Sequence, residues 1–249
     1  MTRPLSLALV AALALLTLGA CDKPQDAAFG NRVRTYLLAH PEVLEEMVQK
    51  LDEKKKLQAA STAKAAIDAN RQALERDPRD FVANPGGKIT VVEFYDYYCG
   101  YCKLAAPEVL ALIAENPDIR FVFKELPVVT AQSAAPARII LSPAARGKTL
   151  ELHRDLMAAK GLDSAVTDRI LRAVGIDPAA ARKGGNSDAV TQHISDNVAL
   201  SHKIGVGGTP AFVVGNRLIE GGDIPAIRAA IAEARSGKLK SINSVQVAR

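Results

Sequence analysis

The sequence predicts an α/β fold with a helical insert and an N-terminal helical extension. Two runs rich in β-branched and aromatic residues, 88–96 and 119–128, enclose one helical stretch, which is typical of strands around a helix. An alanine-rich helical block then separates them from a late strand hairpin. With 249 residues, of which 48% are hydrophobic, the chain is long enough for a substantial core.

The first residues indicate export. The apolar run Leu5–Leu18 is shorter than the roughly 20 residues that a spanning helix needs, but it fits the core of a secretory signal. It ends in Leu18-Gly19-Ala20-Cys21, which resembles a bacterial lipobox. We expect residues 1–21 to be a signal segment and Cys21 to be acylated, which would anchor a periplasmic protein to a membrane. Cleavage after Ala20 by an ordinary signal peptidase, which leaves a soluble periplasmic protein, is the alternative.

A short linker, residues 22–28, leads into a helical extension over residues 29–78. Apolar residues in its first part recur with heptad spacing, interrupted at His40, which predicts an oligomerisation or docking helix and a possible homo-oligomer. Fewer than three full heptads are present, so simple packing of this helix on the main domain is the alternative. The residues at heptad positions are Val33, Leu37, Leu44, Met47 and Leu51.

The main domain is expected over residues 79–237, with the helical insert at about 130–204 and a tail at 238–249. Residues 88–96 read as a buried strand, and residues 99–116 as a helix interrupted by Pro107. Gly215-Asn216 joins two short apolar runs and predicts a two-residue hairpin turn. Asp223 is the expected N-cap of a closing helix.

Charge and cysteine content argue against two classes of protein: nucleic-acid-binding proteins and small disulfide-dense scaffolds. The formal net charge is +5, from 32 basic and 27 acidic side chains spread along the chain, which is poor support for a nucleic-acid partner. Of three cysteines, Cys21 belongs to the export signal. The single remaining pair, Cys99 and Cys102, does not describe a small disulfide-dense scaffold.

The C-x-x-C pair is best explained as a redox centre. A zinc site would need two further ligands at workable spacing, and a structural disulfide closing so short a loop would remove little unfolded-state entropy. If a helix begins at Cys99, unpaired backbone N–H groups and the helix dipole stabilise its thiolate, the reactive form. We therefore expect Cys99 to be an exposed nucleophile and Cys102 a more buried resolving thiol. The reaction needs no metal or organic cofactor, only the Cys99–Cys102 disulfide.

Two segments carry a family resemblance: "FYDYYCGYCK" at residues 94–103 and "GVGGTPAFVVGNRLIEG" at residues 205–221. Together with the helical insert they resemble the DsbA-like thioredoxin-fold thiol–disulfide oxidoreductases. The resemblance implies a thioredoxin fold, with a central mixed sheet flanked by helices. It also implies that Pro210 is a cis-proline beside the active site and that the backbone of Thr209 pairs with an extended substrate. An ordinary turn at Thr209-Pro210 is the alternative.

The resemblance extends to residues around the cysteines. Glu93, six residues before Cys99, occupies the position of a buried acid that would exchange a proton with Cys102, and Lys124 resembles a lysine that often neighbours that acid. An outward-facing pair of strand residues is the alternative for both. Gly100 and Tyr101 help to set redox poise in this family. The Gly-Tyr dipeptide matches disulfide isomerases and the ScsC-type (suppressor of copper sensitivity) members, which carry an N-terminal helical extension used for oligomerisation.

These features predict an envelope enzyme that forms or isomerises disulfides in exported client proteins and exchanges electrons with a membrane redox partner protein. An alternative from another class is a copper-binding or metal-tolerance envelope protein that uses the same two thiols. An envelope scaffold with a vestigial C-x-x-C pair is the third possibility.

Overall fold

The computed structural model describes residues 27–239, which divide between Lys55 and Lys56 into two units that are described separately here. The expected signal segment with Cys21, and most of the expected linker and tail, lie outside the described residues. Among residues 27–239, no helix is long and apolar enough to cross a bilayer.

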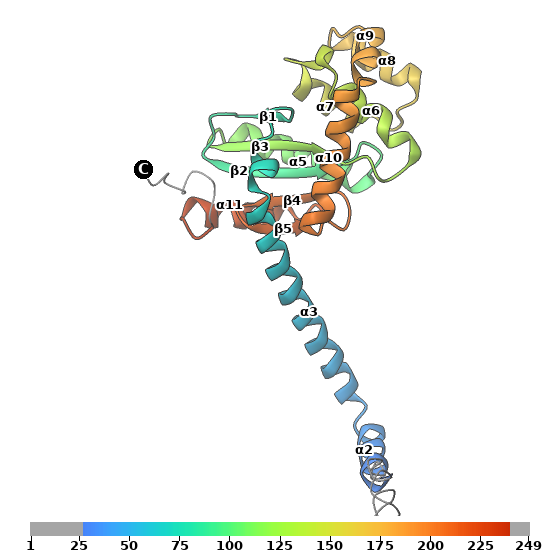
Figure 1. Ribbon diagram of the computed structural model, residues 1–249, viewed down its shortest axis with the longest axis vertical. Coiled ribbons are helices and arrows are strands. Elements are labelled where there is room, and N and C mark those ends of the chain that lie inside the picture. The colour runs from blue at the N-terminus through green and yellow to red at the C-terminus, as the bar shows by residue number, and fades with distance from the viewer. Residues whose placement is uncertain (1–26, 240–249) are drawn as a thin grey trace, which may run out of the picture. The chain divides into compact units, whose positions relative to one another are not determined.

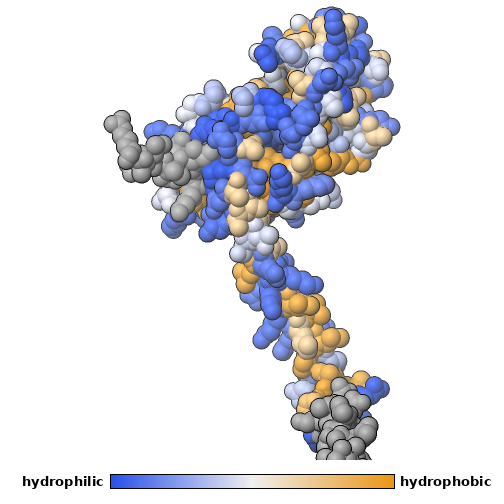
Figure 2. Space-filling view, in the orientation of Figure 1, coloured by the Kyte–Doolittle hydropathy of each residue, from blue (hydrophilic) through white to orange (hydrophobic). Residues whose placement is uncertain are grey.

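The N-terminal unit contains α2 (Ala27–Ala39) and the first part of α3 (Glu42–Ala69). The sequence predicted one continuous helix, but the structure has a break at His40-Pro41. Proline lacks the N–H that a helix needs and disfavours helical geometry in the preceding residue, so α2 ends there. Large apolar side chains are exposed on these helices (Figure 2): Phe29, Val33, Tyr36, Leu37, Leu38, Leu44, Met47, Val48 and Leu51.

The second unit is built on a five-stranded mixed sheet with the order β1-β3-β2-β4-β5 (Figure 1). β2 and β3 are parallel, and the other pairs are antiparallel. The hairpin prediction is confirmed, because Val214 pairs with Arg217 across Gly215-Asn216. The short edge strand β1 was not predicted. The strands are β1 (Phe81–Ala83), β2 (Ile89–Tyr95), β3 (Ile119–Glu125), β4 (Ala211–Val214) and β5 (Arg217–Glu220).

Helices cover both faces of this sheet. On the front face lie α5 (Gly100–Glu115), which continues through Pro107, and α11 (Ile224–Arg235), whose first turn is capped by Asp223 as predicted. On the back face lie the end of α3, α4 (Arg71–Glu75) and α10 (Asp188–Ile204). All seven residues of β2 and all seven of β3 are buried, as expected for strands covered on both sides.

The helical insert connects β3 to β4. The sequence predicted four or five short helices there, and the structure has five α-helices with two short 3-10 turns. Several begin at a side chain that accepts backbone N–H bonds, such as Asp163 before α8 and Asp177 before α9. Besides α10, the helices are α6 (Ala134–Ile140), α7 (Thr149–Ala158), α8 (Ser164–Ala173) and α9 (Pro178–Gly185).

Candidate active site

The two cysteines lie at the start of α5, where the sequence placed them. Cys99 is the N-cap residue, and its Sγ accepts a hydrogen bond from the backbone N–H of Cys102 at 3.3 Å. A thiolate at this position therefore accepts from a backbone N–H that has no carbonyl partner within the helix, and it lies at the positive end of the helix dipole. Both effects stabilise the nucleophilic form of Cys99.

The segment before β4 closes the site from the other side. The Thr209–Pro210 peptide bond is cis, as the resemblance implied, and the Cys99 thiol donates to the Thr209 carbonyl oxygen at 3.1 Å. Gly221 N–H donates to the Pro210 carbonyl at 2.8 Å, and Gly207 N–H donates to a Glu220 carboxylate oxygen at 2.9 Å. These bonds hold the Thr209 backbone beside the nucleophile, where an extended peptide can pair with it.

Both thiols are free, and both are buried. The expectation of an exposed Cys99 is wrong: the residue is only 5% exposed, because its sulfur is enclosed between α5 and Thr209, whereas Cys102 is fully buried. Burial raises the pKa of Cys102 strongly, and a hydrogen bond from the Asp96 backbone opposes this only in part. Cys102 is therefore protonated near neutral pH, and it needs a partner to take its proton before it can attack.

Glu93 is the candidate for this partner, because its charge acts on the Cys102 thiol. It lies on the front face of β2, is 2% exposed, and burial raises its pKa to about 8. One carboxyl oxygen, Oε2, has no hydrogen-bond partner among the described residues. The Glu93 charge also contributes to the raised pKa of Cys102, so the two groups interact electrostatically. A carboxyl group that titrates near neutrality can both donate and accept the Cys102 proton.

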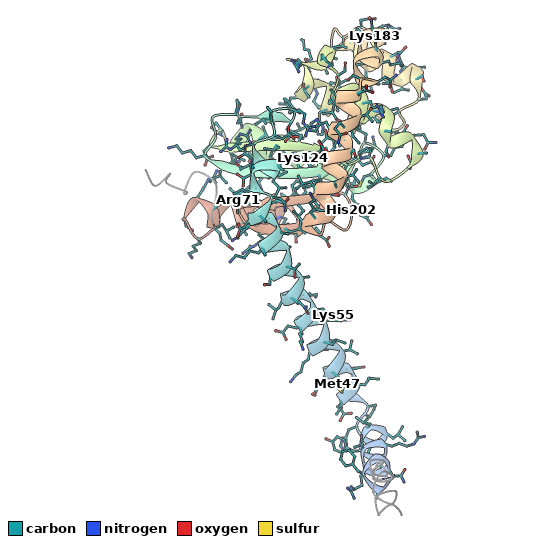
Figure 3. All side chains as sticks on the ribbon, in the orientation of Figure 1. Met47, Lys55, Arg71, Lys124, Lys183 and His202 are labelled. Atoms are coloured by element: carbon teal, nitrogen blue, oxygen red, sulfur yellow. The ribbon has the colours of Figure 1, made fainter. Side chains whose placement is uncertain are left out.

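Lys124, labelled in Figure 3, lies on β3 beside β2. Its side chain does not join this site, so the expectation that it neighbours Glu93 is wrong. In the sheet register Glu93 pairs with Phe123, so Lys124 points to the opposite, back face. There its Nζ lies 2.6 Å from Asp80 Oδ2 and donates to the Ala73 carbonyl at 2.7 Å. Asp80 Oδ1 also lies 2.9 Å from His193 Nε2. Lys124 therefore forms a buried ion pair with Asp80.

A second buried acid, Glu125, was missed by the sequence reasoning. It accepts a short hydrogen bond from the Tyr95 hydroxyl, which lies 3.3 Å from the Tyr97 hydroxyl, and that in turn lies 3.0 Å from His153 Nδ1. Burial raises the pKa of Glu125 well above its usual range, and burial lowers the pKa of His153 to about 3, so the imidazole is neutral near pH 7. The available signal was the alternation of tyrosines in "YDYY", but His153 comes from the distant insert.

The surface beside the cysteines is apolar. Tyr101 is 74% exposed and Leu104 is 76% exposed, on the outer side of the first turns of α5, and Gly100 is also exposed. Val128 and Val129 are exposed as well, and their N–H groups donate to the buried Asp96 carboxylate. Tyr101, Leu104, Val128 and Val129 are called the apolar rim below. Within residues 27–239, no three His, Cys, Asp or Glu side chains lie where they could together hold a metal ion.

Family models match both parts of the chain. Residues 90–230 match the DSBA-like thioredoxin domain, and residues 25–58 match the N-terminal domain of the copper resistance protein ScsC. The chain spans about a quarter of the length of the curated relatives that it matches. One of these is a Na(+)/H(+) antiporter, NhaA 1, of Salinispora arenicola, which is 31% identical over 65% of this chain and 26% of its own.

Solved structures give the same family assignment. A thioredoxin-like oxidoreductase from Silicibacter pomeroyi is 38% identical with a TM-score of 0.63, and the match covers 67% of this chain and 98% of that one. BcfH from Salmonella enterica Typhimurium is 26% identical with a TM-score of 0.73, over 91% and 99% of the two chains. A linker-deletion mutant of Proteus mirabilis ScsC is 26% identical with a TM-score of 0.65, over 89% and 100%. Because the DSBA-like model matches more than half of its residues, this chain belongs to the DsbA-like thioredoxin domain family of thiol–disulfide oxidoreductases.

Proposed function

We propose that this protein catalyses thiol–disulfide exchange in exported proteins of the bacterial envelope. The observation that carries the proposal is the position of Cys99: its sulfur accepts the Cys102 N–H at the start of α5 and donates to the carbonyl of Thr209, directly before cis-Pro210. A nucleophile, a resolving thiol and a strip of backbone for the client are thereby combined in one place.

In the oxidising direction, a client thiolate attacks the Cys99 sulfur of the Cys99–Cys102 disulfide. The S–S bond breaks, and Cys102 leaves as a thiolate that takes a proton from the Glu93 carboxyl group. A second client thiolate then attacks the client sulfur of the mixed disulfide and releases the Cys99 thiolate. The client loses two electrons, and the enzyme gains them as a dithiol. In the isomerising direction, the Cys99 thiolate attacks a client disulfide and releases one client thiolate, and another client thiolate then attacks the client sulfur of the mixed disulfide, which forms a different client disulfide and regenerates the Cys99 thiolate. If no client thiolate does so, Cys102 gives its proton to the Glu93 carboxylate and attacks the Cys99 sulfur, which releases a reduced client and leaves the enzyme as the Cys99–Cys102 disulfide.

The exposed surface around the cysteines suits unfolded client chains. Among the described residues from 56 onwards, the large exposed apolar side chains are Leu57 and the four residues of the apolar rim, which flank the cysteine motif. An extended segment that pairs with the Thr209 backbone would place its own apolar side chains against this rim. A folded client would bury both its cysteines and such side chains, so we infer that the substrates are incompletely folded proteins. A membrane redox partner protein would then recycle the dithiol or the disulfide.

The N-terminal unit supports a finer proposal: the protein self-associates and isomerises disulfides. Its exposed apolar side chains, from Phe29 to Leu51, leave a surface that a second copy can cover, and its residues match the N-terminal domain of ScsC. Several active sites facing one misfolded client would favour shuffling over simple oxidation. Acylation at Cys21 and a periplasmic location belong to the same proposal.

The test is refolding of a scrambled multi-disulfide protein by the mature chain, with and without a reductant, and with Cys99→Ser as the inactive control. Rescue that needs the reductant and is lost in Cys99→Ser is expected for an isomerase. Rapid oxidation of reduced protein without rescue of the scrambled form would instead identify an oxidase. If neither activity depends on Cys99, the proposed function is wrong.

A test of self-association by deletion must leave the second unit intact. Residues up to 76 include Ile67 and Leu74, which are buried against the back of the sheet, so removing them would damage the second unit. Deletion of residues 22–55 leaves these contacts in place. We expect this variant to be monomeric in light scattering, to oxidise a dithiol normally and to shuffle wrong disulfides poorly. An unchanged mass would contradict the assembly proposal.

Copper binding is a second candidate, supported by two free thiols three residues apart and by the copper-resistance description of the N-terminal family model. Thiolates are soft ligands that suit Cu(I). Stoichiometric Cu(I) binding that is lost in Cys99→Ser/Cys102→Ser, together with no catalysis of refolding, would favour this candidate over the enzyme.

A further inference from the structure

Two polar side chains tie the active-site motif to the helical insert. Tyr98 precedes Cys99, and its hydroxyl donates to the Leu162 carbonyl at 3.2 Å. Lys103 follows Cys102, and its Nζ contacts three carbonyl oxygens at the end of α7: those of Leu156 at 3.2 Å, Met157 at 3.3 Å and Ala159 at 2.7 Å. The residue before Cys99 and the residue after Cys102 thereby both bond to the connection between α7 and α8, residues 159–163.

The Lys103 contacts also carry electrostatic weight. The last carbonyls of a helix form the negative end of its dipole, equivalent to about half an elementary charge. Here the carbonyl oxygens at the end of α7 lie within hydrogen-bond distance of Nζ of Lys103, the residue that directly follows Cys102. Without a cation between them, this negative end would oppose a thiolate in the cysteine pair. Burial lowers the pKa of Lys103, and the Cys102 charge opposes that shift, so the lysine and the thiol interact electrostatically.

We propose that Lys103 is a positioning and redox-tuning residue, whose ammonium group fixes the end of α7 beside the cysteines and offsets its negative potential at the thiolate. The inference rests on the proposed function, because tuning matters only to a pair that exchanges electrons. The other groups that act on the pair are Glu93 from β2, the Asp96 backbone from the loop before α5 and the Thr209 carbonyl before β4. None of them supplies positive charge.

The equilibrium to be measured is that between the protein disulfide plus two glutathione thiols and the protein dithiol plus glutathione disulfide. Lys103 stabilises the reduced side, which contains the thiolate. We expect Lys103→Met to lower this equilibrium constant about three- to tenfold, which corresponds to a potential more negative by about 15–30 mV. The midpoint pH of the ultraviolet thiolate absorption of the reduced cysteine pair, measured as one property of the coupled pair, should rise by about half to one pH unit.

Matched variants separate charge from packing. Lys103→Arg keeps the cation and should remain near the wild type in both measurements, even if the three carbonyl contacts rearrange. Lys103→Gln keeps a hydrogen-bond donor without the charge and should show the same shift as Lys103→Met. If the methionine variant does not fold, the glutamine variant serves as the test in its place. Lys160→Met removes an exposed cation from the same connection and should change little, because solvent screens that charge.

The proposal is overturned if Lys103→Gln loses thermal stability while its thiolate absorption and its glutathione equilibrium stay at wild-type values, because Lys103 would then be structural only. The thiolate titration needs no exchange with glutathione, so it decides the role of Lys103 independently. A wild-type protein that shows no exchange at all would instead refute the proposed function, and the two failures can therefore be distinguished.

Discussion

Replacing Glu93 by glutamine should remove a large part of the pH dependence of stability. Burial raises the pKa of Glu93 from the ordinary 4.5 to about 8 in the folded protein. Because the folded carboxyl group holds its proton more tightly than the unfolded one, its contribution to stability is fully present below about pH 4.5 and is lost as the pH rises to about 8. At about 1.4 kcal/mol for each pKa unit, the loss between about pH 5 and pH 8.5 is about 4 kcal/mol. Glutamine does not titrate and should avoid this loss.

The assay is urea unfolding at about pH 5 and about pH 8.5, in a Cys99→Ser/Cys102→Ser background so that thiol ionisation does not enter. Glu75, whose pKa burial also raises, contributes equally to both proteins and cancels in the comparison. Burial is the largest cause of the raised pKa of Glu125 and the Glu93 charge is the smallest, so most of the Glu125 contribution cancels as well. The parent should lose about 4 kcal/mol more than the Glu93→Gln variant across this range. Equal losses in the two proteins would show that Glu93 is not held neutral by burial and would remove its role as proton partner of Cys102.

Three further predictions follow from single contacts. Asp80→Asn should cost about 3–5 kcal/mol in urea unfolding, because it leaves the buried Lys124 cation unpaired, and adding Lys124→Met should recover part of that loss. Asp96→Asn should cost about 1.5–3 kcal/mol and speed hydrogen exchange at the Val128 and Val129 amides, which now donate to its carboxylate. Gly222→Ala places a Cβ 3.1 Å from the Ala105 Cβ and should slow client oxidation, whereas Gly86→Ala, which meets nothing within 4 Å, should not. Wild-type stability of Asp80→Asn would contradict the ion-pair prediction, and wild-type stability or amide exchange in Asp96→Asn would contradict the Asp96 prediction. Equal oxidation rates in the two glycine variants would contradict the prediction for Gly222.

Local sequence signals were sufficient for much of the site. The start of α5 at Cys99, the hairpin turn at Gly215-Asn216 and the Asp223 cap are each determined by neighbouring residues, and each is present in the structure. Pro41 was also a readable signal, because proline after His40 disfavours helical geometry at the preceding residue. The predicted continuous helix overlooked it.

Tertiary contacts decided the remaining positions. β3 is buried at every residue, so hydropathy does not reveal which of its side chains face α5 and which face α10. Only the pairing of Glu93 with Phe123 determines that Glu125 shares the front face and that Lys124 does not. The chain from Glu125 through the tyrosines to His153 depends on a helix of the insert, and Cys99 is enclosed by a segment 110 residues further along the chain.

The separation of the two faces of β3 has a chemical consequence for the redox pair. A lysine beside Glu93 would hold it as a carboxylate and lower its pKa, since an opposite charge within a few ångströms favours the ionised form. Lys124 is instead paired with Asp80 behind the sheet, so burial alone acts on Glu93 and its pKa rises to about 8. In the proposed mechanism, the acid is then protonated near neutral pH when the Cys102 thiolate leaves the disulfide, and it still ionises readily enough to accept the Cys102 proton when the mixed disulfide must be resolved. Under this proposal, the backbone alternation that places Lys124 behind the sheet keeps Glu93 available for proton exchange in both directions of the reaction.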